Sequence, residues 1–220
     1  MVGTVNHRFQ AIGYKLIMKA IIFDLGNVLI DFDHSIAAAR ISKHTNKTPQ
    51  EIYNFFFDSP LTALFEEGKI SEKDFYLEVK KSLDLKISYE EFLPIWNEIF
   101  FLSEKNKAVQ FLAKALKKKF KIAVLSNINW LHYEYINKNY PVFGIFDYVF
   151  LSCELKSKKP DLGIYKVAME TLGVLPQETF YTDDRADLIE ESLKLGMKSF
   201  IFKDSEKLKK DLASCGIHLE

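Results

Sequence analysis

Five side chains of this sequence have the chemical types needed to act together on a phosphorylated molecule. They are a carboxylate, a hydroxyl, an ammonium group and an adjacent pair of acids: Asp24, Ser126, Lys159, Asp183 and Asp184. A carboxylate can attack phosphorus and form an acyl phosphate, which divides one difficult displacement into two easier ones. A hydroxyl with nearby backbone N–H groups can hold the phosphoryl oxygens.

Charge determines what else this chemistry needs. An attacking carboxylate and a phosphate dianion repel each other, and a magnesium ion held by carboxylate oxygens would screen that repulsion. The acidic pair offers such oxygens, and the lysine adds positive charge beside the phosphate. The residue types therefore predict magnesium-dependent phosphoryl transfer.

Short apolar segments bounded by polar residues predict the strands that position these side chains. The segments are residues 20–23, 122–125, 148–151, 179–182 and 199–202. Segments that are apolar on both sides suit a parallel sheet covered by helices on both faces. Helical patterns alternate with them, so we predict a doubly wound, Rossmann-like α/β fold. Ligands of such sheets bind beyond the carboxyl ends of the strands, and Asp24, Ser126 and Asp183 follow strands directly.

Two helices of this core are predicted from caps and spacing. One follows a Ser103 cap and places Val109, Leu112 and Leu116 on a single face. The other carries Leu188, Leu193 and Leu195 and ends at Gly196.

The interval between the first two strands is far longer than a usual crossover connection. Polar caps with an acidic residue three positions later predict helices there after Thr48, Ser71 and Ser88. The aromatic side chains Phe55, Phe56, Phe57 and Trp96 are expected to be mostly core, with one or two at the substrate pocket. The predicted organisation is an N-terminal extension at 1–17, a core domain at 18–32 and 101–220, and an inserted helical cap domain at 33–100.

Four segments, taken in order, resemble the motifs of the haloacid dehalogenase superfamily of hydrolases. They are Phe23-Asp24-Leu25-Gly26-Asn27, Leu125-Ser126-Asn127, Lys159-Pro160 and Asp183-Asp184. The likeness covers residues 18–203 and includes a helical cap at the place where that family inserts one. The segment Ser126-Asn127-Ile128-Asn129, followed by Leu131-His132, is similar in particular to the branch of bacterial phosphatases active on glucose 1-phosphate.

The resemblance implies a role for each of these residues. Asp24 would be the nucleophile and a magnesium ligand, and Gly26 would offer its backbone carbonyl to the same ion. Ser126 and the backbone of Asn127 would bind the phosphoryl oxygens. Lys159 would neutralise the nucleophile and the phosphate, and Asp184, assisted by Asp183, would complete the metal site. The implied substrate is a small phosphorylated metabolite, in particular a sugar phosphate.

One position departs from the family pattern. Most phosphatases of the superfamily have a second aspartate two residues after the nucleophile, as general acid for the leaving group, and this chain has Gly26 there. Loss of a general acid costs roughly 10²–10⁴ in rate. Asp33, His34 or a metal-ordered water are the candidate substitutes, and the sequence does not choose among them.

Two other functions compete with the phosphatase hypothesis. A haloacid dehalogenase needs no general acid, because a halide leaves without a proton, but it needs no metal either, and the Asp183-Asp184 pair favours a phosphate substrate. The other alternative is a non-catalytic protein that binds a phosphorylated metabolite. In that case, Gly26 in place of the general acid would indicate that catalytic activity has been lost.

Composition excludes several other classes of protein. Thirty basic residues balance thirty acidic ones, so no net field attracts nucleic acid or an anionic membrane. No apolar run reaches the ~20 residues that span a bilayer. The two cysteines lack metal-ligand or disulfide-framework spacing. We therefore expect a cytoplasmic protein that binds neither nucleic acid nor membrane, with an oligomeric state that the sequence leaves open.

Overall fold

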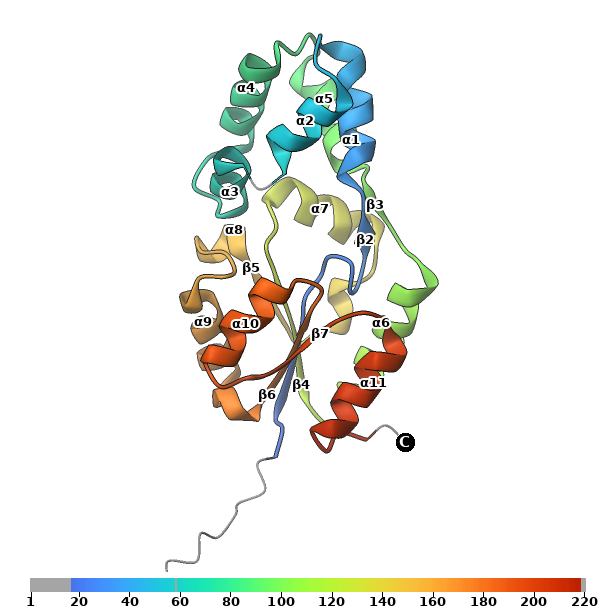
Figure 1. The fold of residues 1–220 in the computed structure, drawn as a ribbon, viewed down its shortest axis with the longest axis vertical. Coiled ribbons are helices and arrows are strands. Elements are labelled where there is room, and N and C mark those ends of the chain that lie inside the picture. The colour runs from blue at the N-terminus through green and yellow to red at the C-terminus, as the bar shows by residue number, and fades with distance from the viewer. Residues whose placement is uncertain (1–16, 58, 219–220) are drawn as a thin grey trace, which may run out of the picture.

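The computed structural model describes residues 17–57 and 59–218, so the predicted N-terminal extension, except for Ile17, lies outside the described residues. A five-stranded parallel sheet in the order β5-β4-β1-β6-β7 forms the centre (Figure 1). Its strands are β1 (Ala20–Phe23), β4 (Lys121–Ser126), β5 (Tyr148–Leu151), β6 (Thr179–Asp183) and β7 (Lys198–Ile201). The five predicted strands agree with these to within one residue at each end.

Helices cover both faces of the sheet. One face carries α6 (Glu104–Leu116) and α11 (Ser205–Ser214), and the other carries α9 (Leu162–Leu172) and α10 (Ala186–Lys194) (Figure 1). Successive side chains of a strand point to opposite faces, so Ile21 and Phe23 pack with α6 and α11 while Ala20 and Ile22 pack with α9. All four are fully buried, as a doubly covered parallel strand requires. The doubly wound α/β fold is confirmed.

The two core helices that the sequence predicts are present as α6 and α10. Ser103 caps α6, and the predicted residues Val109, Leu112 and Leu116 are all buried. In α10, however, Leu193 is 50% exposed, and Ile189 and Ser192 accompany Leu188 on the buried face. The reason is geometric: at 3.6 residues per turn, a residue five positions along lies well around the helix from the first.

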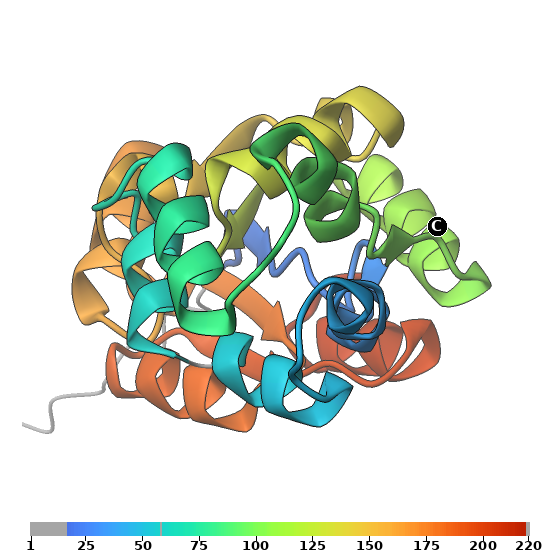
Figure 2. The same cartoon turned by 90° about the horizontal axis from the view of Figure 1, so that it is seen from above.

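A layer of five helices, the helical layer, stands above the carboxyl ends of the strands. It consists of α1 (His34–Ile41), α2 (Pro49–Phe56), α3 (Pro60–Glu66), α4 (Glu72–Leu83) and α5 (Tyr89–Asn97). Thr48, Ser71 and Ser88 cap α2, α4 and α5 as predicted. Figure 2 views the molecule from the side of this layer.

A short antiparallel ribbon leads the chain into the helical layer and back. It is formed by β2 (Asp31–Phe32) and β3 (Phe100–Phe101), in which Phe32 pairs with Phe100. Strands of two residues are too short to give a periodic signal, so the sequence did not predict them. The other short elements are α7 (Trp130–Asn139), α8 (Ser152–Leu155), η1 (Ser42–His44), η2 (Phe143–Ile145) and η3 (Pro176–Glu178).

The helical layer has an aromatic core of its own. Phe56, Phe65, Phe75, Phe92 and Trp96 are all buried in one cluster. The Phe65 and Phe75 rings stack with centroids 4.2 Å apart, and Phe92 stacks on Trp96 at 5.8 Å. Aromatic pairs of this kind add about 0.5–1.5 kcal/mol each beyond the area they bury. The layer is therefore stabilised mainly by its own packing.

Contacts at the end of α3 join the helical layer to α8 and the loop that follows it. Ser152 Oγ donates to the carbonyl oxygen of Glu66 at 2.6 Å, and Lys156 Nζ donates to that of Gly68 at 2.6 Å. The Glu66 carboxylate accepts from Lys158 Nζ at 2.6 Å. Gly68 has a φ of 58°, and a Cβ there would overlap the carbonyl oxygen of Cys153. The close approach of the two parts thus requires glycine.

None of the helices in the described ranges is both long and apolar enough to cross a membrane.

The contact at Gly68 predicts the effect of one substitution. Gly68→Ala should lower the free energy of unfolding by about 1–3 kcal/mol, because it forces a left-handed backbone on alanine and a steric overlap. Gly144→Ala is the matched control, since a Cβ at Gly144 meets nothing within 4 Å, and its effect should stay within about 0.5 kcal/mol. Urea denaturation of both variants measures the difference, and equal stabilities would contradict the assignment.

Candidate active site

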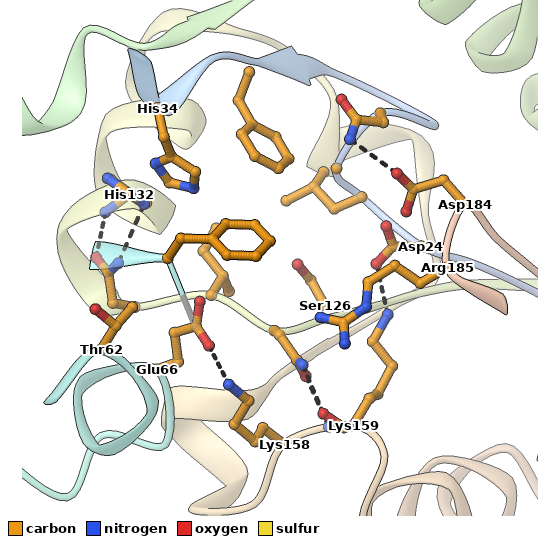
Figure 3. A pocket seen from close by; sticks show the side chains of 18 of the residues that line it. Asp24, His34, Thr62, Glu66, Ser126, His132, Lys158, Lys159, Asp184 and Arg185 are labelled. Atoms are coloured by element: carbon orange, nitrogen blue, oxygen red, sulfur yellow. Dashed lines mark hydrogen bonds and ion pairs between the residues drawn. The ribbon is translucent and has the colours of Figure 1, made fainter. Parts of the chain in front are cut away.

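A pocket of about 600 Å³ lies between the carboxyl ends of the strands and the helical layer (Figure 3). In Figure 3, His34, Thr62 and Glu66 of the layer lie on one side with His132, and Asp24, Lys159 and Asp184 lie on the other. Every site residue that the sequence predicts lines this pocket: Asp24, Gly26, Ser126, Asn127, Lys159, Asp183 and Asp184. The fold therefore brings together residues from four separate segments of the chain.

Lys159 forms the electrostatic centre of the pocket. Its side chain is 1% exposed, so it is not the solvated loop cation that a neighbouring run of lysines would suggest. Its Nζ lies 2.6 Å from Asp24 Oδ1 and 2.7 Å from Asp183 Oδ2. The Tyr181 hydroxyl also donates to Asp183 Oδ2. One buried cation thus holds two buried carboxylates in place.

Burial and these charges shift the pKa values of the group. Burial, together with the charge of Asp183, raises the pKa of Asp24 to about 7, although Lys159 opposes the shift. Burial alone would lower the pKa of Lys159, but the carboxylates of Asp183 and Asp24 raise it above its ordinary value. Lys159 is therefore a fixed positive charge beside the candidate nucleophile.

Asn127 positions Lys159 through a pair of backbone hydrogen bonds. Its side-chain Nδ2 donates to the Lys159 carbonyl oxygen, and its Oδ1 accepts from the Lys159 N–H, both at 2.8 Å. Ser126, 3% exposed at the end of β4, lies beside it at the pocket wall. The side chain of Asn127 thus has a structural task that the sequence did not predict, because the partner loop is 32 residues away.

The acidic groups are arranged so that they could hold a divalent cation. Among the described residues, Asp24, Asp183 and Asp184 each offer a carboxylate oxygen within 4.8 Å of the others. Asp183 Oδ1 also accepts the Arg185 N–H at 2.9 Å, so both of its oxygens have hydrogen bonds. Burial raises the pKa of Asp184, the more open of the pair. A hard cation with oxygen ligands, such as Mg²⁺, fits this donor set.

Asn27 contributes to the same cluster and was not predicted from the sequence. Its Nδ2 donates to Asp184 Oδ2 at 2.9 Å, which orients that carboxylate. Its backbone has a φ of 56°, and its N–H donates to the Ile30 carbonyl oxygen, closing a tight turn after Asp24. Asparagine tolerates this left-handed conformation better than most residues. An Asn shortly after a predicted strand is therefore the sequence signal that could have identified this turn.

Gly26 lies in the same turn, and an aromatic ring fills the space beside it. A Cβ at Gly26 would be 2.6 Å from Cε1 of Phe32. The Phe32 ring makes edge contacts with His34, at 5.0 Å between centroids, and lies 6.2 Å from Phe100. Of the candidate substitutes for the missing acid, Asp33 and His34 both line the pocket, and Asp33 is exposed and accepts from Ser35 N at 2.8 Å as the cap of α1.

His132 packs at the floor of the helical layer rather than standing free in the pocket. Its Nε2 lies 3.1 Å from the Trp96 carbonyl oxygen, and its Nδ1 lies 3.1 Å from Asn129 Nδ2. Only a neutral ring with its proton on Nε2 satisfies both partners. Burial, with the nearby His34, lowers the pKa of His132 to about 3. The imidazole is therefore a structural link between α7 and α5.

The aromatic residues of the layer divide as follows. Phe56 and Trp96 are buried and also line the pocket, as expected. Phe57 lines the pocket but is 61% exposed, so it is not a core residue. It follows the last residue of α2, where the helix no longer directs side chains inward.

Comparisons with known proteins agree with this geometry. A family model described as haloacid dehalogenase-like hydrolase matches residues 18–191. D-ribitol-5-phosphate phosphatase of Bacteroides thetaiotaomicron is 25% identical over 189 residues, which are 83% of this chain and 91% of that protein. A phosphatase of Mycobacterium tuberculosis is 26% identical over 213 residues, which are 92% of this chain and 97% of that protein.

Solved structures are similar as well. One is an enzyme of the same family from Bacteroides thetaiotaomicron in complex with magnesium and inorganic phosphate, with a TM-score of 0.75 and 27% identity over 85% of this chain and 95% of that one. L-2-haloacid dehalogenase from Xanthobacter autotrophicus has a TM-score of 0.61 and 18% identity over 92% of this chain and 85% of that one. The second likeness concerns the fold alone.

The buried ion pairs predict a large effect of removing Lys159. Lys159→Met should lower the free energy of unfolding by about 3–5 kcal/mol, because it leaves Asp24 and Asp183 buried without a cation. Lys107→Met, which removes an exposed pair with Glu104, serves as the control and should cost little. Chemical denaturation at pH 7 compares the two, and a similar loss in both would contradict a central role for Lys159.

The neutral state of His132 predicts a dependence of stability on pH. Its pKa falls from an ordinary 6.5 to about 3 in the folded chain, so between these values the unfolded chain binds the extra proton. Stability is therefore fully present above pH 6.5 and is lost as the pH falls. Between pH 6.5 and 5, wild type should lose about 1.5 kcal/mol more than His132→Gln. Parallel curves for the two proteins would show that His132 does not carry this dependence.

Proposed function

Because the chain belongs to the haloacid dehalogenase-like hydrolase family, we propose that it is a magnesium-dependent phosphatase of small phosphorylated metabolites with Asp24 as its nucleophile. The observation that carries the proposal is the buried arrangement of Asp24 beside Lys159, with Asp183 and Asp184 close enough to share a divalent cation. The phosphatases among its relatives support the same reaction.

The cation would be Mg²⁺, held by Asp24, Asp184 and the Gly26 backbone carbonyl, with Asp183 anchoring the cluster. When bound, it supplies the positive charge that offsets the repulsion between a carboxylate and a phosphate dianion. Support comes from the three carboxylate oxygens within 4.8 Å and from the magnesium and phosphate bound to a relative of similar structure.

The residues of the chain divide the reaction among them. Asp24 attacks phosphorus through one carboxylate oxygen while the bond from phosphorus to the leaving oxygen breaks, and that oxygen takes up a proton and departs as the alcohol. Lys159 stabilises the charge that accumulates on the phosphoryl oxygens. Ser126 and the backbone N–H of Asn127 hold those oxygens. Water then attacks the phosphorus of the aspartyl phosphate, which releases phosphate and restores the Asp24 carboxylate.

The helical layer would act as the cap domain that sets the substrate class. A pocket of about 600 Å³ beneath it has room for a small molecule rather than a protein or a nucleic acid. One relative acts on a polyol phosphate, D-ribitol 5-phosphate, which favours a sugar phosphate here. Residues 33–100 as a domain, and a cytoplasmic location, stay predictions.

Carbon–halogen hydrolysis is the less favoured alternative. The likeness to a haloacid dehalogenase is one of fold, at 18% identity. A halide substrate gives no reason for three acids to stand within reach of one cation, whereas a phosphate dianion does. The acidic cluster therefore favours phosphate.

The proposal predicts phosphate release that depends on both Asp24 and magnesium. Wild type should release phosphate from a panel of sugar phosphates with Mg²⁺ present and lose that activity in EDTA. Asp24→Asn should reduce the rate by at least about 10³, because an amide cannot serve as the nucleophile. Phosphate release assayed by colour formation measures both effects.

Asp147→Asn is the matched control, because Asp147 pairs with Lys117 far from the pocket and should leave the rate unchanged. Chloride release from a haloacid without metal would instead establish the dehalogenase. Binding of phosphorylated compounds with no turnover over hours would indicate a binding protein.

A further inference from the structure

The helical layer presents an exposed aromatic side chain to the pocket. Phe57 is 61% exposed, and among the described residues it is the only exposed large hydrophobic side chain that lines the pocket. Apolar surface that is open to water beside a pocket is typical of a ligand-binding site, because a ligand that covers it removes that surface from water. The position of Phe57 is therefore better explained by contact with a ligand than by packing within the layer.

Tyr53 supports the Phe57 ring. The two rings are stacked, with centroids 5.6 Å apart and an angle of 11° between their planes. The residues are four positions apart, the spacing that places side chains on one face of a helix, and the Phe57 N–H donates to the Tyr53 carbonyl oxygen at 2.8 Å. Both residues line the pocket. Tyr53 and Phe57 thus form a flat, rigid surface, the aromatic platform.

A charged pair lines the same pocket. Glu66 at the end of α3 and Lys158 in the loop after α8 are joined at 2.6 Å, and their side chains are 24% and 18% exposed (Figure 3). A ligand without polar groups that filled the pocket would remove water from both charges and give them no new partner, which is unfavourable. The pair therefore favours an occupant that carries hydrogen-bonding groups as well as a flat apolar face.

A sugar ring has both of these features. The C–H groups on one side of a pyranose form a flat face with a slight positive charge, which suits the negative face of an aromatic ring. Its hydroxyl groups project around the edge of the ring, where they can donate to a carboxylate or accept from an ammonium group. An open-chain polyol has the same hydroxyl groups but no flat face, and its rotatable bonds lose more entropy on binding.

From these observations we infer that the pocket selects phosphates of sugars in their ring form, with the ring stacked on the aromatic platform and its hydroxyl groups at the Glu66–Lys158 pair. The inference rests on the proposed phosphatase function and names the substrate class within it. Phe57 is the residue to which the selection is assigned. Phosphates of open-chain polyols, and of rings without hydroxyl groups, are disfavoured.

Three phosphates of primary alcohols test the inference on the wild-type protein with Mg²⁺ present. Glucose 6-phosphate carries a hydroxylated ring, sorbitol 6-phosphate is its open-chain counterpart, and benzyl phosphate has a flat ring without hydroxyl groups. We expect kcat/KM for glucose 6-phosphate to exceed that for sorbitol 6-phosphate by about tenfold, because the ring stacks and loses less entropy. It should exceed that for benzyl phosphate by a similar factor of about ten, because the benzyl ring leaves the charged pair without a partner.

Substitution of Phe57 tests the aromatic platform. Phe57→Leu removes the aromatic face at an exposed position, so the fold should be retained. It should lower the ratio of kcat/KM for glucose 6-phosphate to that for sorbitol 6-phosphate by about fivefold, chiefly through KM. Phe57→Trp keeps a flat aromatic face and should keep the ratio. Phe111→Leu, which changes a similarly exposed phenylalanine of α6 outside the pocket, is the matched control and should leave the rates unchanged.

Substitution of Glu66 tests the polar edge of the site. Glu66→Gln keeps the size of the side chain and removes its charge, which weakens hydrogen bonds from the sugar hydroxyl groups. It should lower kcat/KM for glucose 6-phosphate relative to benzyl phosphate by about fivefold. The ratio is the quantity to compare, because loss of the ion pair with Lys158 affects both substrates. The wild-type comparison needs no variant, so a variant that fails to fold leaves the inference testable.

Other outcomes overturn the inference in distinguishable ways. Equal or higher kcat/KM for sorbitol 6-phosphate, or an unchanged ratio in Phe57→Leu, would show that the platform does not select a ring, while the phosphatase function stands. A preference for benzyl phosphate would assign the pocket to aromatic phosphates instead of sugars. No phosphate release from any of these compounds or from acetyl phosphate would overturn the proposed function itself.

Discussion

A lysine ammonium buried between two carboxylates is the interaction on which the rest of the structure depends. Lys159 contacts Asp24 and Asp183 at 2.6 and 2.7 Å, and its side chain is almost completely removed from water. An unpaired charge in that position would cost several kcal/mol. Each of the three charged groups therefore needs its oppositely charged partner beside it. Asp24 directly follows β1, Asp183 ends β6 and Lys159 lies in the loop after α8, so the register of the parallel sheet determines whether the three groups meet.

The buried ion pairs of Lys159 lie in a pocket that is enclosed by the helical layer. Electrostatic interactions strengthen where water is excluded, and the helical layer provides that enclosure above the carboxyl ends of the strands. Its aromatic core is separate from the two cores of the sheet, and it meets the sheet domain chiefly through the β2–β3 ribbon, the His132 link and the contacts at the end of α3. Few contacts of high specificity therefore set the shape of the pocket.

Several ionisable side chains that line the pocket near Asp24 already have hydrogen-bond or ion-pair partners. Among the described residues that line the pocket from the layer side, Asp33 caps α1 and Glu66 pairs with Lys158, and the buried His132 is a neutral ring. Phe32 occupies the space beside Gly26, so the turn after β1 offers no side chain at that position. On the core side of the pocket, the buried positive charge of Lys159 lies against Asp24 and Asp183.

The sequence by itself determined the fold class, the five strands of the central sheet, four helix caps and the residues that gather at the sheet edge. These follow from local patterns: apolar segments, capping residues and polar residues placed directly after strands. Tertiary structure alone decided the hold of Asn127 on Lys159, the orientation of Asp184 by Asn27, and the filling of the Gly26 space by Phe32. No local sequence pattern specifies these contacts. The distance between the two residues of each contact depends on how separate parts of the chain pack together. Packing also decided the buried face of α10, where Ile189 and Ser192 are buried with Leu188 and Leu193 is exposed.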